Sequence, residues 1–197
     1  MKKVIFLSLL LLGCIGLTGC NSCKSDNGKQ EEVLAELVVE NTVSADREWM
    51  FENYGSDYSW YETCVLLKDY LDEECDGTVE GVSNVFQSLI EKEKGFDSQA
   101  IVSAYAAGKH TTDVRAGLWV GDFPLNDEEI KITFKEAFER IMEANFPKPH
   151  SRQCVLRREV GSKPNVAPQY IFGNVQAQLY VDAVTGEVTD ENPAYIE

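Results

Sequence analysis

The segment from Asn126 to Asn145 constrains the fold most, because its apolar side chains recur at helical spacing. Asn126 is a residue type that caps helices, and Glu129 stands where a side chain reaches back to such a cap. Pro147 and Pro149 cannot continue a helix, so it should end near Asn145. The apolar face consists of Ile130, Phe134, Ala137, Phe138, Ile141 and Met142. We therefore expect one long amphipathic helix packed on a sheet.

Strand-like runs follow this helix. Cys154 to Val160 is compatible with a strand, and Tyr170 to Phe172 is a second apolar run. Residues Ala177 to Ala183 alternate between apolar and polar, which predicts a strand with one solvated face. Thr185-Gly186 is a turn signal, and the Asp182 carboxylate or the Thr185 hydroxyl is placed to hydrogen-bond local backbone. The C-terminal part is thus predicted as helix followed by paired strands.

This order, closing on Asp182 to Val188, resembles the PepSY domain and, more loosely, the small secreted and lipid-anchored PepSY-like proteins of the Bacteroides group. The family's helix bears a Glu-Ala pair, here Glu136-Ala137, and its last strand ends in Asp-Ala-x-Thr-Gly-x-Val, here Asp182 to Val188. The resemblance spans residues 126–188. It implies an extracytoplasmic, non-enzymatic binding or regulatory module, and a role in restraining peptidases has been proposed for the family. It transfers no catalytic residue.

The N-terminus predicts secretion and lipid attachment. Met1-Lys2-Lys3 is positively charged, Val4 to Leu12 is apolar, and Leu17-Thr18-Gly19-Cys20 matches a bacterial lipobox. We therefore expect residues 1–19 to be a lipoprotein signal peptide and Cys20 to be the acylated first residue of the mature chain. Acyl chains on Cys20 would anchor the protein in a membrane. Asn21 in place of Asp favours the outer membrane of a Gram-negative bacterium.

Residues 20–30 are polar and predict a flexible tether between the lipid and the folded part. The formal net charge of −15 becomes −17 once Lys2 and Lys3 leave with the signal peptide. Such an acidic chain has no basic stripe for phosphate contacts, so we expect no nucleic-acid partner.

Residues 31–125 predict an antiparallel, β-rich N-terminal part. The stretch from Glu31 to Val43 fits either a short helix or an edge strand, and Ser44 is placed to cap a short helix that ends at Gly55. Tyr58 to Leu71 has apolar residues on both faces, which is typical of a central strand. Asp76-Gly77 predicts a hairpin turn. Further runs are Val79–Ile90, the alternating Ile101–Tyr105, and Val114–Val120.

The expected fold class is α+β, with an antiparallel meander sheet, one long amphipathic helix packed on it, and the PepSY-like part at residues 126–197. Residues 31–125 and 126–197 should form one globular domain. No repeated motif relates the two parts, so we expect a unique meander rather than a second copy of the C-terminal unit.

Few residues carry recognisable chemistry. His110 and His150 lie in predicted turns, where solvated histidines are more common than catalytic bases. The acidic run from Asp72 to Gly77 resembles a calcium loop only faintly, because Ser83 stands where an EF-hand needs a bidentate Glu. A nucleophile formed by Cys154 and His150 is supported only by their proximity in sequence. We expect no cofactor, no metal and no enzymatic activity.

The remaining cysteines leave two alternatives open. Cys64 and Cys75 flank one predicted turn and are the leading candidates for a disulfide. The alternative is that Cys64, Cys75 and Cys154 are buried free thiols. Cys23 lies in the tether.

Aromatic residues gather between the first predicted helix and the first strand: Trp49, Phe51, Tyr54, Tyr58, Trp60 and Tyr61. They could line a pocket for a peptide or a glycan, although filling the core is the more common role of such residues. The sequence therefore predicts a lipid-anchored envelope protein that binds or regulates an envelope partner such as a peptidase. A glycan- or cation-binding surface lipoprotein is the alternative.

Overall fold

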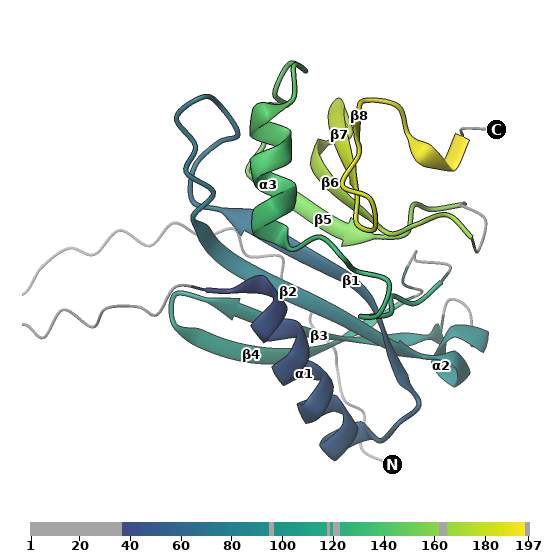
Figure 1. Cartoon of the computed structure of the whole chain (residues 1–197). Helices are drawn as coiled ribbons and strands as arrows, with labels where there is room; N and C mark the ends of the chain where they lie inside the picture. Colours follow the sequence, from purple (N-terminus) through teal and green to yellow (C-terminus); the bar gives the residue numbers. More distant parts are fainter. Residues whose placement is uncertain (1–36, 95–96, 118, 120–122, 162–164, 196–197) are drawn as a thin grey trace, which may run out of the picture. The chain divides into compact units, whose positions relative to one another are not determined.

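The structure, a computed structural model, describes residues 37–94, 97–117, 119, 123–161 and 165–195 (Figure 1). These residues belong to one compact unit. The lipid-attachment residue Cys20, the signal peptide at 1–19 and the tether at 20–30 lie outside the described residues.

One antiparallel sheet of eight strands, in the order β4-β3-β2-β1-β5-β6-β7-β8, forms the centre of the molecule. The strands are β1 (Tyr58–Leu67), β2 (Val79–Ser88), β3 (Gln99–Ala106), β4 (Lys109–Ala116), β5 (Gln153–Arg157), β6 (Gln169–Asn174), β7 (Ala177–Asp182) and β8 (Val188–Thr189). The predicted α+β class with an antiparallel sheet is confirmed. The prediction that β1 is central is also confirmed, because β1 pairs with both β2 and β5.

Two helices cover the same face of this sheet (Figure 1). Helix α1 (Val39–Tyr54) packs against β1 and β2, and helix α3 (Phe134–Glu143) packs against β7. The short α2 (Leu89–Glu93) follows β2, and a 3-10 turn, η2 (Pro193–Tyr195), ends the described chain. No described helix is long and apolar enough to cross a bilayer.

The two parts of the chain repeat one plan, because each consists of a helix followed by four antiparallel strands. The two sets of strands meet where β1 pairs with β5, at the centre of the sheet. The expectation of a unique meander was therefore wrong at the level of topology. No repeated sequence motif accompanies this repeat of topology.

Helix α3 begins later than its apolar pattern predicted. Thr133, not Asn126, is the cap: its hydroxyl accepts a hydrogen bond from Glu136 N, and the Glu136 carboxylate accepts one from Thr133 N at 2.8 Å. This reciprocal capping box satisfies two backbone N–H groups that a helix start otherwise leaves unpaired. Asn126 instead accepts a hydrogen bond from Glu128 N in a preceding turn.

Helix α1 is longer than predicted, and Ser44 does not cap it. The helix begins at Val39 without a side-chain cap, and the Ser44 hydroxyl donates to the Glu40 carbonyl inside the helix. Burial of one face therefore stabilises this helix in place of a terminal cap. It ends as predicted at Gly55, whose positive φ of 83° suits glycine.

Two local predictions near β1 were wrong. The strand ends at Leu67, and a loop from Lys68 to Thr78 replaces the tight hairpin expected at Asp76-Gly77. Cys64 lies within β1 whereas Cys75 lies in this loop, and both thiols are free. The Cys64–Cys75 disulfide is therefore not formed, and buried or partly buried free thiols are observed instead.

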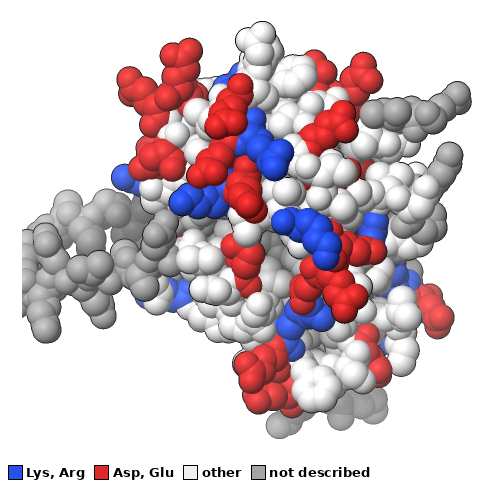
Figure 2. All heavy atoms as spheres, in the orientation of Figure 1, with Lys and Arg blue, Asp and Glu red and all other residues white. Residues whose placement is uncertain are grey.

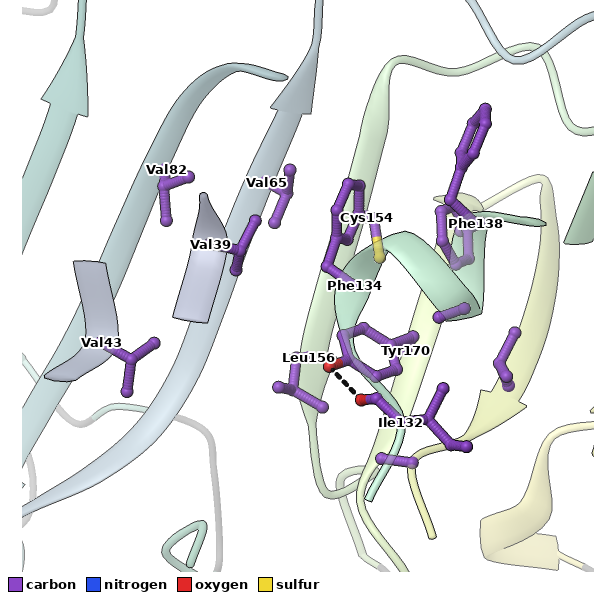
Figure 3. Close-up of a cluster of buried hydrophobic side chains, with 14 of the residues drawn as sticks. Val39, Val43, Val65, Val82, Ile132, Phe134, Phe138, Cys154, Leu156 and Tyr170 are labelled. Carbon is purple, nitrogen blue, oxygen red and sulfur yellow. Dashed lines mark hydrogen bonds between the residues drawn. The ribbon is translucent and has the colours of Figure 1, made fainter. Parts of the chain in front are cut away.

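The hydrophobic core lies between the helices and the sheet (Figure 3). Val39 and Val43 of α1 contact the apolar residues of β1 and β2, while α3 contributes Phe134, Ala137, Phe138 and Ile141 over β5 to β7. Tyr170 buries its ring in this layer and donates its hydroxyl to the Ile132 carbonyl at 2.8 Å. The predicted apolar face of the C-terminal helix is confirmed for these four α3 residues.

The closing turn follows the sequence prediction. The Asp182 carboxylate accepts hydrogen bonds from Val184 N and Thr185 N, both at 2.8 Å, and Thr185 Oγ1 accepts one from Glu187 N. Gly186 has a positive φ of 75° and packs under the Arg140 guanidinium, where a side chain would collide. The Asp-Ala-x-Thr-Gly run is therefore a structural turn that joins β7 to β8.

Candidate functional site

A buried carboxylate, Asp46, organises the space beneath α1. Asp46 is fully buried. Its Oδ1 accepts hydrogen bonds from Ser103 Oγ and Tyr105 OH of β3, both at 2.7 Å, and its Oδ2 accepts one from Asn84 Nδ2 of β2 at 2.7 Å. Three donors thus compensate for the loss of water around a buried carboxylate.

The hydrogen bonds continue from Asp46 across the sheet. Asn84 also donates to Thr42 of α1 and accepts from Thr63 Oγ1 of β1 at 2.6 Å. Thr63 in turn accepts from the Trp60 indole at 3.0 Å. We call these residues, with Asp46, Ser103, Tyr105 and His110, the Asp46 network. It ties α1 to four neighbouring strands through polar contacts in the interior.

His110 connects the network to the edge of the sheet. It lies at the start of β4, where its Nε2 is 2.6 Å from Ser103 Oγ and 3.3 Å from Asp46 Oδ1. Its ring stacks on Tyr105, with centroids 4.4 Å apart. The prediction that His110 lies in a turn was wrong, because it belongs to strand β4 and is held on one side by buried polar groups. Its side chain is 37% exposed, as expected of a solvated residue.

Serine, histidine and aspartate thus meet here, but not in the geometry of a hydrolase triad. A triad requires the aspartate on Nδ1 and the serine on Nε2, whereas Ser103 and Asp46 both approach Nε2 of His110. Ser103 is also fully buried, and its hydroxyl donates to Asp46 rather than to the imidazole. This arrangement holds elements together and offers no accessible nucleophile.

The Asp46 carboxylate also affects the pKa of the Tyr105 phenol. Burial raises the pKa of its phenol well above the ordinary value, and the hydrogen bond to Asp46 raises it further. The phenol therefore stays protonated and continues to donate across the whole physiological pH range.

The aromatic residues at the end of α1 form one wall of an open groove of about 540 Å³. Trp60 and Phe86 are buried in its floor, whereas Phe51 is 67% exposed at its rim. Some rings of the aromatic cluster therefore fill the core and others face the groove. Binding of a peptide or glycan in this groove stays a prediction. The lining also includes Arg47, Glu48, Met50, Gly55, Ser56, Tyr58, Ser59, Pro124, Leu125 and Asn126.

Charged side chains are distributed among uncharged ones on the helix side of the molecule (Figure 2). Asp and Glu predominate, with Lys and Arg among them. One such pair, Arg47 with Asp127, joins α1 to the segment before α3. Its side chains are about half exposed, so the pair should contribute little to stability.

The face opposite the long helices carries an uncharged row that crosses all eight strands. Register pairing aligns the row from Thr111 on β4 to Thr189 on β8. Its residues are Thr111, Ala104, Ser83, Cys64, Val155, Ile171, Tyr180 and Thr189. We call this the uncharged row. Ala104, Ser83, Cys64 and Val155, at and beside the β1–β5 junction, are each partly exposed.

Near this row, one charged cluster lies at the junction of the two halves. Arg157 of β5 contacts Glu62 at 3.5 Å and Glu159 at 3.2 Å, and both carboxylates are largely buried. The Cys64 thiol donates to Glu62 at 3.0 Å. Burial raises the pKa of this thiol strongly, and the Glu62 charge adds to the effect, so Cys64 is not a reactive thiolate.

The structure does not assemble the other chemical candidates. His150 is exposed and stacks on Tyr70 at 4.2 Å, whereas Cys154 is fully buried in the core. Burial raises the pKa of the Cys154 thiol well above its ordinary value, which disfavours the thiolate that catalysis would need. In the acidic run, Asp72 and Asp76 accept hydrogen bonds from the backbone of Glu74 and Thr78. The described part of the chain has no group of three or more side chains arranged to hold a metal ion.

Sequence reasoning missed the Asp46 network, although a signal was present. Val39, Val43, Asp46 and Met50 recur at helical spacing, and Thr42 joins them on the buried side. A polar residue inside an apolar helical stripe indicates a buried hydrogen-bonded group. Reading Ser44 as a cap removed Val39 to Val43 from the helix and concealed this pattern.

No protein-family model, curated protein or solved structure matches the chain.

Proposed function

We propose that this chain is a non-enzymatic, lipid-anchored cell-envelope protein of PepSY-like type that binds or regulates an envelope partner such as a peptidase. The helix, strands and closing turn at residues 133–189 are consistent with that resemblance. The lipobox ending at Cys20 supports attachment to a membrane, and Asn21 favours the outer membrane.

The uncharged row is the observation that carries the proposal. Charged residues make up 26% of the chain, yet none of them stands in a row that crosses eight strands. Both long helices lie on the other face of the sheet (Figure 1). Six residues of the row are exposed or partly exposed, whereas Ile171 and Tyr180 are each only 3% exposed. Protein interfaces are depleted of charge at their centre, and partly exposed Ser83, Cys64 and Val155 occupy that position here.

The partner-binding part is tested with the chain from Asn21 onward added to envelope extract, while peptide hydrolysis by the extract is measured. We expect a change in hydrolysis that Ser83→Arg abolishes, because the substitution places a charge in the middle of the row. Glu139→Arg, on the exposed side of α3, is the matched control and should behave as wild type. An equal effect of wild type and Ser83→Arg would contradict the proposal.

The anchoring part is tested separately in the native cell. Mass spectrometry of the mature N-terminus should show acylated Cys20, and Cys20→Ala should release the protein from the membrane fraction. An unmodified Cys20 in a membrane-bound protein would contradict this part while leaving the binding surface open to test.

The groove at the end of α1 favours a second candidate, a glycan-binding surface lipoprotein. Its volume of about 540 Å³ lies within the range of small-ligand sites, and the exposed Phe51 ring with neighbouring Tyr58 offers faces on which a sugar can stack. Calorimetry against a panel of oligosaccharides should detect a ligand whose binding Phe51→Ala removes. Tyr70→Ala, an exposed aromatic elsewhere, is the control.

A further inference from the structure

Strand β4 is a long open edge of the sheet. All eight of its residues are exposed, whereas β8 at the opposite edge has two residues. An edge strand presents unpaired backbone N–H and C=O groups to any chain that can lie beside it. Within the described residues, β4 is therefore the longer surface for strand pairing.

The hairpin before β4 sets which backbone groups point outward. Ala107 and Gly108 both have positive φ, 50° and 70°, and connect Ala106 to Lys109 as a two-residue turn. Such a turn is closed by a hydrogen-bonded pair, so Lys109 bonds to β3 and the pattern then alternates along the strand. The residues that direct N–H and C=O away from the sheet are His110, Thr112, Val114 and Ala116.

The Asp46 network holds this edge in place. His110 at the start of β4 contacts Ser103 and Asp46, and Tyr105 stacks on its ring. The edge is therefore fixed from the interior before a partner arrives, which lowers the entropic cost of pairing.

The charges of β4 complement a second copy of the same strand. With two copies antiparallel and Val114 opposite Val114, Asp113 of each copy lies opposite Arg115 of the other. Val114, 49% exposed in the single chain, is then covered by its counterpart. The pairing also uses the outward N–H and C=O groups of Thr112 and Ala116.

Other registers of the two β4 strands place less favourable residues opposite each other. A centre at Asp113 places two aspartates opposite each other, and a centre at Thr112 places Lys109 opposite Arg115. A centre at Thr111 pairs Lys109 with Asp113, but it leaves Val114 opposite the turn residue Gly108. The charge pattern therefore selects the register centred on Val114.

We propose that two copies of the chain pair antiparallel through β4 about Val114 and join their sheets into one. This edge shares only Thr111 with the uncharged row on which the proposed function rests. Each copy without residues 1–19 carries a formal net charge of −17, which is the −15 of the full chain less Lys2 and Lys3, but a Debye length of about 8 Å at physiological ionic strength confines repulsion to the interface, where the charges alternate. A single strand pair buries little area, so we expect a weak dimer with a Kd on the order of 100 μM.

Sedimentation velocity of the chain from Asn21 onward, carrying Cys23→Ser to remove the tether thiol, tests the association. Wild type should form dimers as its concentration rises through this range. Thr112→Pro removes an outward N–H without touching the bonds to β3, and it should leave only monomer. Thr112→Val keeps the N–H and should still dimerise. A chain that stays monomeric, or a dimer that survives Thr112→Pro, would overturn the proposal.

The register is tested with charges and cross-links. Asp113→Arg should weaken the dimer about tenfold, since two attractive pairs become repulsive, and the double variant Asp113→Arg/Arg115→Asp should restore it. Under oxidation Val114→Cys should form a disulfide-linked dimer, whereas Thr111→Cys, placed opposite Gly117, should not. Cross-linking of Thr111→Cys alone, or failure of the charge exchange to restore dimers, would overturn this register.

Discussion

The two halves of the sheet share a plan but differ in the chemistry of their cores. One row of register-paired residues on the helix side crosses all eight strands, and it changes character at the β1–β5 junction. Beneath α1 the row is polar: Thr112, Ser103, Asn84 and Thr63. Beneath α3 it reads Leu156, Tyr170, Val181 and Val188.

The contrast teaches that one architecture can be stabilised in two ways. The α3 half depends on apolar contacts, which are non-directional and tolerate modest changes of shape. The α1 half has apolar contacts too, but it adds hydrogen bonds to one buried carboxylate, which have fixed geometry and fail together if the carboxylate is lost. Substitutions in the two halves should therefore have effects of different kinds.

Removal of the carboxylate should have the largest effect. Asp46→Ala leaves Asn84, Ser103 and Tyr105 with buried, unpaired groups, so we expect a loss of about 4 kcal/mol in the free energy of unfolding, measured by guanidinium denaturation. Asp46→Asn keeps the shape and one acceptor oxygen, and it should cost about half as much. Equal stability of wild type and Asp46→Ala would show that the network does not support the α1 half.

An apolar truncation in the other half should follow closely. Ile141 of α3 is completely buried, and Ile141→Ala should cost about 3 kcal/mol through lost transfer free energy and the cavity left behind. Glu139→Ala, on the exposed side of the same helix, should change stability by less than about 0.5 kcal/mol in the same denaturation experiment. A cost near zero for Ile141→Ala would contradict the packing of α3 on the sheet.

Helix starts offer a smaller test of the comparison. Thr133→Ala removes the cap of α3 and should cost about 1 kcal/mol. Ser44→Ala in α1 should change stability by less than about 0.5 kcal/mol, because Ser44 lies inside that helix and caps nothing. If Ser44→Ala proved the more costly of the two in thermal or chemical unfolding, the assignment of the caps would be wrong.

The smallest effect concerns acid pH. Hydrogen bonds from the Thr133 backbone N–H and hydroxyl lower the pKa of Glu136 below its ordinary value of 4.5. A carboxyl whose pKa is lowered by folding contributes its full stabilisation above the unfolded pKa, here the ordinary value of 4.5. This contribution disappears as pH falls through the folded pKa. Glu136→Gln should therefore show a shallower loss of stability than wild type below pH 4.5, and identical slopes would contradict this.

Much of the apolar half could be predicted from the sequence, since amphipathic spacing and turn residues are local signals. The sequence correctly placed four α3 residues in the core: Phe134, Ala137, Phe138 and Ile141. It also correctly predicted the turn formed by Asp182. The polar half could not, because hydrogen bonds between residues 38 to 59 positions apart leave no local trace.

Choices between neighbouring caps were a second source of error. Asn126 and Thr133 each stand three residues before a Glu, and the sequence alone does not distinguish them. The segment between them meets Ala183, whose carbonyl accepts from Lys131 N and Ile132 N. That distant contact keeps the segment extended and delays the helix until Thr133.

The position of the β1–β5 junction has a consequence for how the polypeptide tolerates division. Cleavage between β4 and α3 would yield two fragments. In each fragment a strand that is central in the intact protein, β1 or β5, would become an exposed edge strand, because its partner is on the other fragment. Neither should be soluble by itself, whereas co-production should allow fragment complementation, with the seam at β1 and β5 restoring the whole.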